Sequence, residues 1–185
     1  MGQDGIMTAQ PWQPIVLRTR RLDLVGVDPA QAQALADGVC PLPCAPGYPH
    51  ADTSSAARLA RAAIEFDNWV PGYGMYMIVR RSDGLVVGDI GFHAPPDLRG
   101  AAEIGYGLAA SAQHQGYMSE ALAALLDWAH ANGCATVLAD VDPGNAPSIA
   151  VLERCGFTQV RSAGPQLRLR HVGQGWSAGS GGPER

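Results

Sequence analysis

The most restrictive feature of the sequence is a succession of three short apolar runs near its middle. Met75 to Arg80 and Leu85 to Phe92 are separated by the turn Ser82-Asp83-Gly84, and a third run covers Ala101 to Leu108. Short apolar runs bounded by turn residues are typical of β-strands, and a tight turn that contains Asp-Gly joins neighbours as a hairpin. A chain with this pattern must build three adjacent antiparallel strands, which commits its centre to a sheet.

The hydrophobic period then changes from that of a strand to that of a helix. Leu122, Leu125, Leu126 and Ala129 form one apolar stripe, and Asn132-Gly133 is a helix stop signal. The elements expected after this long helix are a strand over Thr136 to Ala139, a helix over Ala146 to Arg154, and a closing strand pair over Phe157 to Val160 and Leu167 to Val172. This order predicts an α/β (mixed α+β) fold in which helices pack on a mixed sheet.

The first part of the chain adds one expected strand and two helices. Apolar and polar residues alternate within Ile15 to Val27, which predicts the strand. Asp28 followed by Pro29 is an N-cap with a proline at the first helical position, and predicts a helix that runs to about Asp37. The candidate N-caps of the second helix are Thr53, Ser54 and Ser55, and its end is expected at Trp69 and Pro71.

Length and charge limit the class of protein. The 185 residues suit one domain, which we expect over residues 15–172, with a flexible N-terminus at 1–14 and a flexible Gly-rich tail at 173–185. The formal net charge is −4 and every basic residue is an arginine, so no nucleic-acid partner is expected. No apolar run approaches the roughly 18–20 residues of a membrane span, so we expect no membrane partner and a cytoplasmic location.

The four cysteines predict reduced thiols rather than a disulfide framework. They are Cys40, Cys44, Cys134 and Cys155, and they form no CxxC pair. Cys40 and Cys44 could supply half of a metal site, but no His or Cys at a suitable spacing completes it. We therefore expect no metal.

A polar turn between the third central strand and the long helix is a candidate anion site. It reads Gln113-His114-Gln115-Gly116-Tyr117-Met118-Ser119, with Glu120 in the first helical turn. The backbone N–H groups at a helix start lack intrahelical partners and carry the positive end of the helix dipole, so they attract anions such as phosphate. Gly116 lets an anion approach the main chain closely. The turn is neither a P-loop nor a dinucleotide-binding glycine fingerprint.

A second polar pair lies at the start of the following helix. Asn145 and Ser148 are three residues apart, so one side chain can cap the helix while the other projects into the groove between strands. Asn145 as a simple N-cap is the alternative interpretation.

With these motifs the sequence resembles the GCN5-related N-acetyltransferases (GNAT), and within them the ribosomal-protein alanine N-acetyltransferases. The resemblance runs from about Leu17 to Phe157. It is carried by Leu17-Arg18-Thr19-Arg20-Arg21-Leu22, Ala102-Glu103-Ile104-Gly105-Tyr106, Gln113-x-x-Gly116, Glu120-Ala121, Asn145-x-x-Ser148 and Leu152-x-x-x-Gly156-Phe157. It implies a mostly antiparallel sheet of about seven strands, with helices on both faces and a central parallel pair that splays apart.

The resemblance further implies that acetyl-CoA is the co-substrate and lies in this splay, between Ala101 to Leu108 and Thr136 to Ala139. The residues expected to bind it are Leu108, Ala109, Gln113, His114, Gln115, Gly116, Tyr117, Met118, Ser119 and Asn145. The chain departs from the family pattern in two respects. Met118 occupies a position that is usually small, and no Lys or Arg occurs between Arg99 and Arg154. The cradle is therefore expected to depend on backbone amides.

Acetyl transfer to an amine requires a group that takes the amine proton and a proton for the leaving thiolate. Glu103 is the expected base, directly or through a water, and His93 is the alternative. Ser148 is the expected acid, with Asn145 as an orienting residue, although the thiolate can also leave without an acid. Many relatives use a tyrosine here, but none occurs in or after the last helix. The aromatic residues that could line the acceptor side are Trp69, Tyr73, Tyr76 and Phe92.

The sequence predicts an acetyl-CoA-dependent N-acetyltransferase that forms a ternary complex without a covalent enzyme intermediate. Its acceptor is a primary amine, either on a small molecule or at a protein N-terminus. The alternatives are a non-catalytic acyl-CoA-binding or sensing domain and, third, an interaction module that uses a sheet edge and the tail. A homodimer is compatible with all three.

Overall fold

A computed structural model describes residues 14–65, 70–161 and 164–173, and includes thirteen elements. The strands are β1 (Val16–Arg18), β2 (Leu22–Gly26), β3 (Met75–Arg80), β4 (Leu85–Phe92), β5 (Ala101–Leu108), β6 (Thr136–Val141), β7 (Thr158–Val160) and β8 (Leu167–Val172). The helices are α1 (Pro29–Ala36), α2 (Ala51–Glu65), the short 3₁₀ helix η1 (Ala110–Ala112), α3 (Tyr117–Ala131) and α4 (Ala146–Arg154). The expected flexible ends and Trp69 lie outside the described residues, apart from positions 14 and 173.

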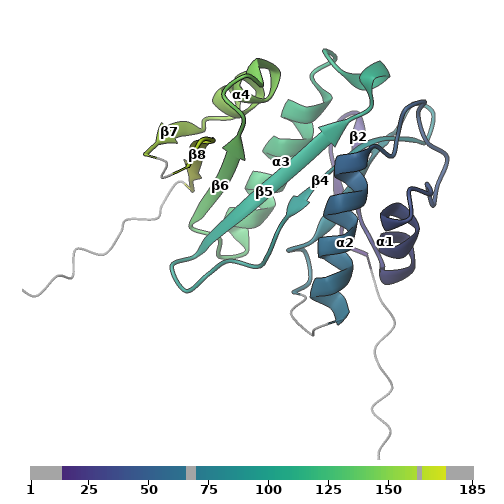
Figure 1. Ribbon diagram of the computed structural model, residues 1–185, viewed down its shortest axis with the longest axis horizontal. Coiled ribbons are helices and arrows are strands. Elements are labelled where there is room, and N and C mark those ends of the chain that lie inside the picture. Colours follow the sequence, from purple (N-terminus) through teal and green to yellow (C-terminus); the bar gives the residue numbers. More distant parts are fainter. Residues whose placement is uncertain (1–13, 66–69, 162–163, 174–185) are drawn as a thin grey trace, which may run out of the picture.

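The strands form one twisted sheet in the order β1-β2-β3-β4-β5-β6-β8-β7 (Figure 1). All neighbours are antiparallel except β5 and β6, which are parallel. The predicted GNAT-like, mostly antiparallel sheet with one central parallel pair is therefore confirmed. It has eight strands because Ile15 to Val27 is a hairpin of two strands, in which Thr19 N–H donates to the Leu22 carbonyl at the turn.

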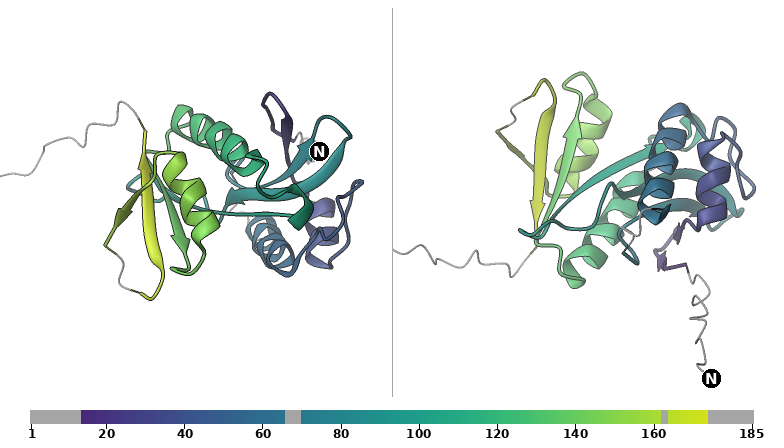
Figure 2. Two further views of the ribbon diagram at one scale, coloured as in Figure 1. Left: turned by 90° about the horizontal axis from the view of Figure 1, so that it is seen from above. Right: turned by 60° about the horizontal axis from the view of Figure 1, so that its bottom comes forward.

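Helices cover both faces of the sheet, as predicted. The α1 and α2 helices pack against each other on one face, and α3 lies on the opposite face (Figure 2). The α4 helix lies beside β6 and contacts α3. The buried core continues from Leu22 and Leu24 of β2 to Leu122 and Leu125 of α3. None of the helices in the described part of the chain is long and apolar enough to cross a membrane.

The start of α2 differs from the prediction. The helix begins at Ala51, so Thr53 and Ser54 lie in its first turn rather than before it. His50 provides the cap, because its Nδ1 accepts the backbone N–H of Thr53 at 3.3 Å. The Thr53 hydroxyl instead donates to the buried Asp89 carboxylate at 2.6 Å. Thr53 therefore does not cap α2, because its hydroxyl binds a residue of β4 that lies 36 positions later in the chain.

The expectation of four reduced cysteines is wrong for one pair. Cys40 and Cys44 are joined as a disulfide within the loop between α1 and α2. One isolated β-bridge, between Cys44 and Val86, joins the same loop to β4. Cys134 and Cys155 are free thiols.

The turn of the β1–β2 hairpin is tied to the start of α3 by one partly buried carboxylate. Glu120 accepts hydrogen bonds from the Thr19 hydroxyl at 2.7 Å, from the Arg21 backbone N–H at 2.8 Å and from Arg21 Nε at 2.6 Å. Burial alone would raise the pKa of Glu120, but the hydrogen bonds from Thr19 and Arg21 outweigh it and lower that pKa overall. This carboxylate therefore fixes the edge of the sheet relative to α3.

We expect Glu120→Gln to lower the free energy of unfolding by about 1–3 kcal/mol, the usual range for a hydrogen bond to a charged group. Because folding lowers the pKa of Glu120, its contribution is complete above the pKa of the unfolded side chain and disappears as the pH falls through the folded pKa. Urea denaturation at neutral and at acid pH measures the loss of unfolding free energy and its dependence on pH. The control is Glu65→Gln, an exposed carboxylate 4.0 Å from Arg61. Equal stability of the two variants at neutral pH would contradict the assignment.

Candidate active site

The two parallel central strands separate after a short paired segment. Ala101, Ala102 and Glu103 of β5 pair with Thr136, Val137 and Leu138 of β6, and no further pairs join them. Beyond that point β5 continues along β4 as far as Leu108, while β6 continues along β8 as far as Val141. The predicted splay is present, and its open part lies beside the carboxyl-terminal half of β5 (Figure 1).

The splay exposes backbone groups of β5. The Ala109 N–H donates to the Val87 carbonyl, and the His93 N–H donates to the Glu103 carbonyl. Since hydrogen bonding alternates along an antiparallel strand, Glu103, Gly105, Gly107 and Ala109 face β4. The main-chain groups of Ile104, Tyr106 and Leu108 therefore face the gap. An extended ligand in the gap can hydrogen-bond to them as a further strand would.

The start of α3 faces the same gap. Gly116 is its N-cap, in a left-handed conformation with φ 75°, and no side chain caps this helix. The first-turn amides thus stay available to an anion. A cleft of about 680 Å³ extends from this helix start to α4. Its lining residues are His50, Asp52, Tyr106, Gly107, Leu108, Gln113, His114, Gly116, Met118, Ser119, Asn145, Pro147, Ser148, Ala150, Val151 and Arg154.

Most of the predicted cofactor residues meet at this cleft. Leu108, Gln113, His114, Gly116, Met118, Ser119 and Asn145 all line it. Ala109, Gln115 and Tyr117 do not, and the main-chain N–H and carbonyl of Ala109 are already bonded to Val87 and Ala112. Met118 is buried in the core, so a large side chain at this position is accommodated under the helix start.

Two arginines from outside the loop contact its residues. Arg154 of α4 lines the cleft, and its Nη1 lies 3.3 Å from Ser119 Oγ. Arg21 lies behind the loop, where its Nη1 donates to the Gln115 carbonyl at 2.9 Å and its guanidinium stacks on the Tyr117 ring at 4.6 Å. In the sequence, Arg154 is the first arginine after this loop, whereas the contact of Arg21 from the hairpin has no local signal.

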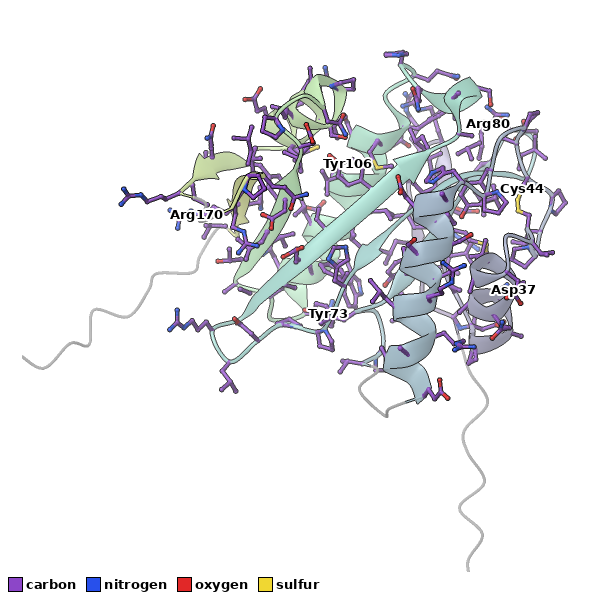
Figure 3. All side chains as sticks on the ribbon, in the orientation of Figure 1. Asp37, Cys44, Tyr73, Arg80, Tyr106 and Arg170 are labelled. Carbon is purple, nitrogen blue, oxygen red and sulfur yellow. A yellow bond between two sulfur atoms is a disulfide. The ribbon has the colours of Figure 1, made fainter. Side chains whose placement is uncertain are left out.

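Tyr106 is a site residue that the sequence analysis missed. Its hydroxyl crosses from β5 to α4 and donates to the Ser148 carbonyl at 3.1 Å. Figure 3 shows Tyr106 in the upper part of β5, near α4. Burial raises the pKa of Tyr106 to about 12, so the hydroxyl stays protonated at neutral pH. In the sequence, a tyrosine for this role is expected in or after the last helix, whereas this side chain comes from the opposite wall.

A second cavity, of about 300 Å³, lies on the α2 face of the same strand. It shares His50, Asp52 and Tyr106 with the cleft, so the two spaces meet at these residues. Its other lining residues are Ser55, Ala56, Leu59 and Ala60 of α2, Met75 of β3, Asp89, Ile90, Gly91 and Phe92 of β4, His93, and Gly105 of β5. Phe92 is thus the one described aromatic of the predicted acceptor set that lines it; Tyr73 and Tyr76 are core residues.

Glu103 lines neither cavity but is bonded to a residue that does. Its Oε1 lies 3.1 Å from Nδ1 of His93, and its Oε2 lies 3.4 Å from Nη2 of Arg168. Arg168 also binds Asp140, and this hydrogen bond lowers the pKa of Asp140. The cluster places His93, rather than Glu103, at the edge of the second cavity.

Asn145 and Ser148 have the arrangement that their spacing predicts. Asn145 Oδ1 accepts the backbone N–H of Ser148 at 3.2 Å, which makes Asn145 the N-cap of α4. Both residues also line the cleft. No group of three or more His, Cys, Asp or Glu side chains among the described residues could hold a metal ion.

Comparisons with known proteins agree with this geometry. Residues 21–158 match the family described as Acetyltransferase (GNAT) domain. The chain is 30% identical over 111 residues to the uncharacterized N-acetyltransferase YjdG of Bacillus subtilis (strain 168), a match that covers 60% of this chain and 66% of that protein.

Solved structures have the same fold. An acetyltransferase from Agrobacterium tumefaciens str. C58 superposes with a TM-score of 0.62 at 28% identity, over 88% of this chain and 96% of that one. The ribosomal L7/L12 α-N-protein acetyltransferase RimL, solved in complex with coenzyme A, superposes with a TM-score of 0.63 at 22% identity, over 85% of this chain and 98% of that one.

The uncapped start of α3 generates a binding prediction. We expect Gly116→Asp to weaken acetyl-CoA binding by at least about tenfold, or 1.4 kcal/mol, because it puts negative charge where the phosphates bind. Calorimetry measures this. The control is Gly84→Asp, which adds the same side chain at a similar positive φ in open space at the β3–β4 turn. If both variants bind acetyl-CoA as the wild type does, the anion site is elsewhere.

Proposed function

Because the chain belongs to the GNAT acetyltransferase family, we propose that it transfers the acetyl group of acetyl-CoA to a primary amine in a ternary complex. The observation that carries this proposal is the meeting of two cavities at Tyr106, one beside the helix start and one beside paired titratable side chains. A donor and an acceptor can then approach the same point from opposite faces of β5.

The cleft suits acetyl-CoA. The first-turn amides of α3 and the guanidinium of Arg154 would hold the phosphates. The main-chain groups of Tyr106 and the N–H of Leu108 would pair with the pantetheine amides, whereas the Leu108 carbonyl already accepts Gln113 Nε2 at 3.3 Å. This pairing directs the thioester toward Tyr106 and Gly107. In this arrangement most donor contacts come from backbone, which explains how a chain without lysine can serve this co-substrate.

The second cavity suits the acceptor. Its volume of about 300 Å³ is at the small end of ligand pockets, and can hold a small amine or the first residue of a protein N-terminus. Asp52 and Asp89 both line it, so two carboxyl groups face a bound amine. The apolar part of the acceptor would lie against Leu59 and Phe92.

The proton of the amine has a path through His93. The Glu103 carboxylate accepts the Nδ1 hydrogen of His93, which leaves Nε2 to accept a proton from the acceptor. His93 is then the catalytic base and Glu103 a positioning residue. This combines the two candidates that the sequence left as alternatives. A sensing domain would use the same cleft but gives this pair no role.

The leaving thiolate lies near α4 in this scheme. The Ser148 hydroxyl would supply its proton, and Asn145 and Tyr106 would fix the Ser148 backbone on both sides. The cytoplasmic location and the homodimer remain predictions.

The role of Glu103 is tested by Glu103→Gln. We expect kcat/KM to fall about 10²-fold, within the usual range for a general base, with unchanged acetyl-CoA affinity. The pH profile should change, because the side chain that binds Nδ1 of His93 is no longer a carboxylate. The measurement is release of free CoA with a panel of primary amines, with Glu65→Gln as control. An unaltered pH profile would remove Glu103 from the proton path, and absence of turnover in the wild type would favour the sensing domain.

The role of Ser148 is tested by Ser148→Ala. As a true acid, its loss should slow kcat by about 10²–10⁴-fold and leave the binding of acetyl-CoA intact. Ser82→Ala, in the exposed β3–β4 turn, is the matched control. A wild-type rate in Ser148→Ala would mean that the thiolate leaves without a protein acid.

A further inference from the structure

Two glycines on either side of Tyr106 mark the positions of two histidine rings. A Cβ atom on Gly105 would lie 2.8 Å from Nε2 of His93, and a Cβ atom on Gly107 would lie 2.6 Å from Nε2 of His50. Residues two apart on a strand share a face, so both rings lie on the α2 face. The Gly-Tyr-Gly sequence therefore leaves room for two imidazoles beside the second cavity, which both histidines line.

The hydrogen bonds assign the proton of His93 to Nδ1. Its partner, Glu103 Oε1, is a carboxylate oxygen and accepts only. Nε2, the nitrogen next to Gly105, therefore has a free lone pair. The charged groups around this ring are Glu103 on β5, Asp140 on β6 and Arg168 on β8.

The hydrogen bonds assign the opposite tautomer to His50. Its Nδ1 accepts the backbone N–H of Thr53, in the first turn of α2, at 3.3 Å. A nitrogen that accepts this bond has no proton of its own, so the neutral ring has its hydrogen on Nε2. Nε2 is the nitrogen that lies against Gly107.

The surroundings of His50 maintain this arrangement. Thr53 Oγ1 lies 3.2 Å from Nδ1 and 3.4 Å from Nε2, but its own proton goes to Asp89 at 2.6 Å. The threonine oxygen can therefore only accept from the ring. Because Nδ1 already accepts the Thr53 backbone N–H, the ring hydrogen that faces this oxygen is the one on Nε2, 3.4 Å away. The titratable groups that face His50 are Asp89 on β4, Asp52 on α2 and Tyr48 in the preceding loop.

We propose that His50 is a catalytic hydrogen-bond donor, whose Nε2–H binds the thioester carbonyl oxygen while His93 takes the proton of the amine. This rests on the proposed function. His50 is suited to the task because it lines both the cleft and the second cavity, whereas His93 lines only the second. The neutral imidazole stays a donor throughout and does not exchange its proton with the substrates.

The transfer balances with these groups. The amine lone pair forms the new C–N bond to the carbonyl carbon, and the carbonyl π pair moves to the oxygen, where the Nε2–H of His50 stabilises the charge. One proton passes from the amine nitrogen to Nε2 of His93. The electron pair returns, the C–S bond breaks, and the sulfur leaves as thiolate and is protonated by the Ser148 hydroxyl, which recovers its proton from solvent.

The tautomers can be measured directly. Nitrogen-15 NMR of the full chain distinguishes Nε2–H from Nδ1–H imidazoles, and the spectra of His50→Asn and His93→Asn identify the signals by their absence. We expect Nε2–H for His50 and Nδ1–H for His93. A protonated Nδ1 on neutral His50 would overturn the proposal, whether or not the chain acetylates any amine.

His50→Asn separates the cap from the donor. Asparagine is a good N-cap, so it can still accept the Thr53 N–H, but it is too short to extend to Gly107. We expect kcat to fall about 10²–10³-fold, as when one such donor is removed. The melting temperature, acetyl-CoA affinity and shape of the pH profile should not change.

Three other results would contradict this role. A kcat within about threefold of wild type would show that His50 donates nothing in the transition state. Loss of the acidic limb in His50→Asn would make His50 the base. Absence of turnover in the wild type would overturn the proposed function and this role with it, whereas an active wild type unaffected by His50→Asn overturns this role alone.

Discussion

The separation of β5 from β6 after three paired residues is the constraint on which the rest of the structure depends. A parallel pair that stayed joined would satisfy its backbone groups internally and leave no site. Because the strands part at Glu103 and Leu138, the main chain of β5 becomes available, α3 starts at the wide end of the gap, and Tyr106 can span it to α4. The hydrogen bond from the Tyr106 hydroxyl to the Ser148 carbonyl then sets the distance between β5 and α4.

Charge is distributed in two zones around this gap. On the α3 side, Glu120 binds Arg21 and holds it against the Gln115 carbonyl in the turn before α3, and Glu120 itself does not line the cleft. On the α2 side, Glu103 orients the ring of His93, and the Asp89–Thr53 hydrogen bond orients the ring of His50. In both zones Glu120, Glu103 and Asp89 each bind a neighbouring side chain and hold it in place.

The sequence predicts the parts of the fold that depend on local chemistry. The boundaries of β3, β4, β5 and α4 agree with the predicted runs to the residue, because turns and caps next to each element define its ends. Errors arose where a distant partner decides the outcome. Thr53 resembles a cap until Asp89 binds it, and Ile15 to Val27 resembles one strand until Glu120 holds its turn. The candidate site was similarly incomplete, since His50 and Tyr106 reach it from elements far apart in the chain.

The alternation of backbone direction along β5 has a consequence for how function is inherited. In the proposed scheme, the cleft that would hold the co-substrate presents largely main-chain groups of Tyr106, Leu108 and the first turn of α3, which almost any residues at these positions would supply. The second cavity, which would hold the acceptor, is lined largely by individual side chains of α2 and β4. Under this scheme, sequence drift in α2 and β4 would change the acceptor and leave the donor unchanged.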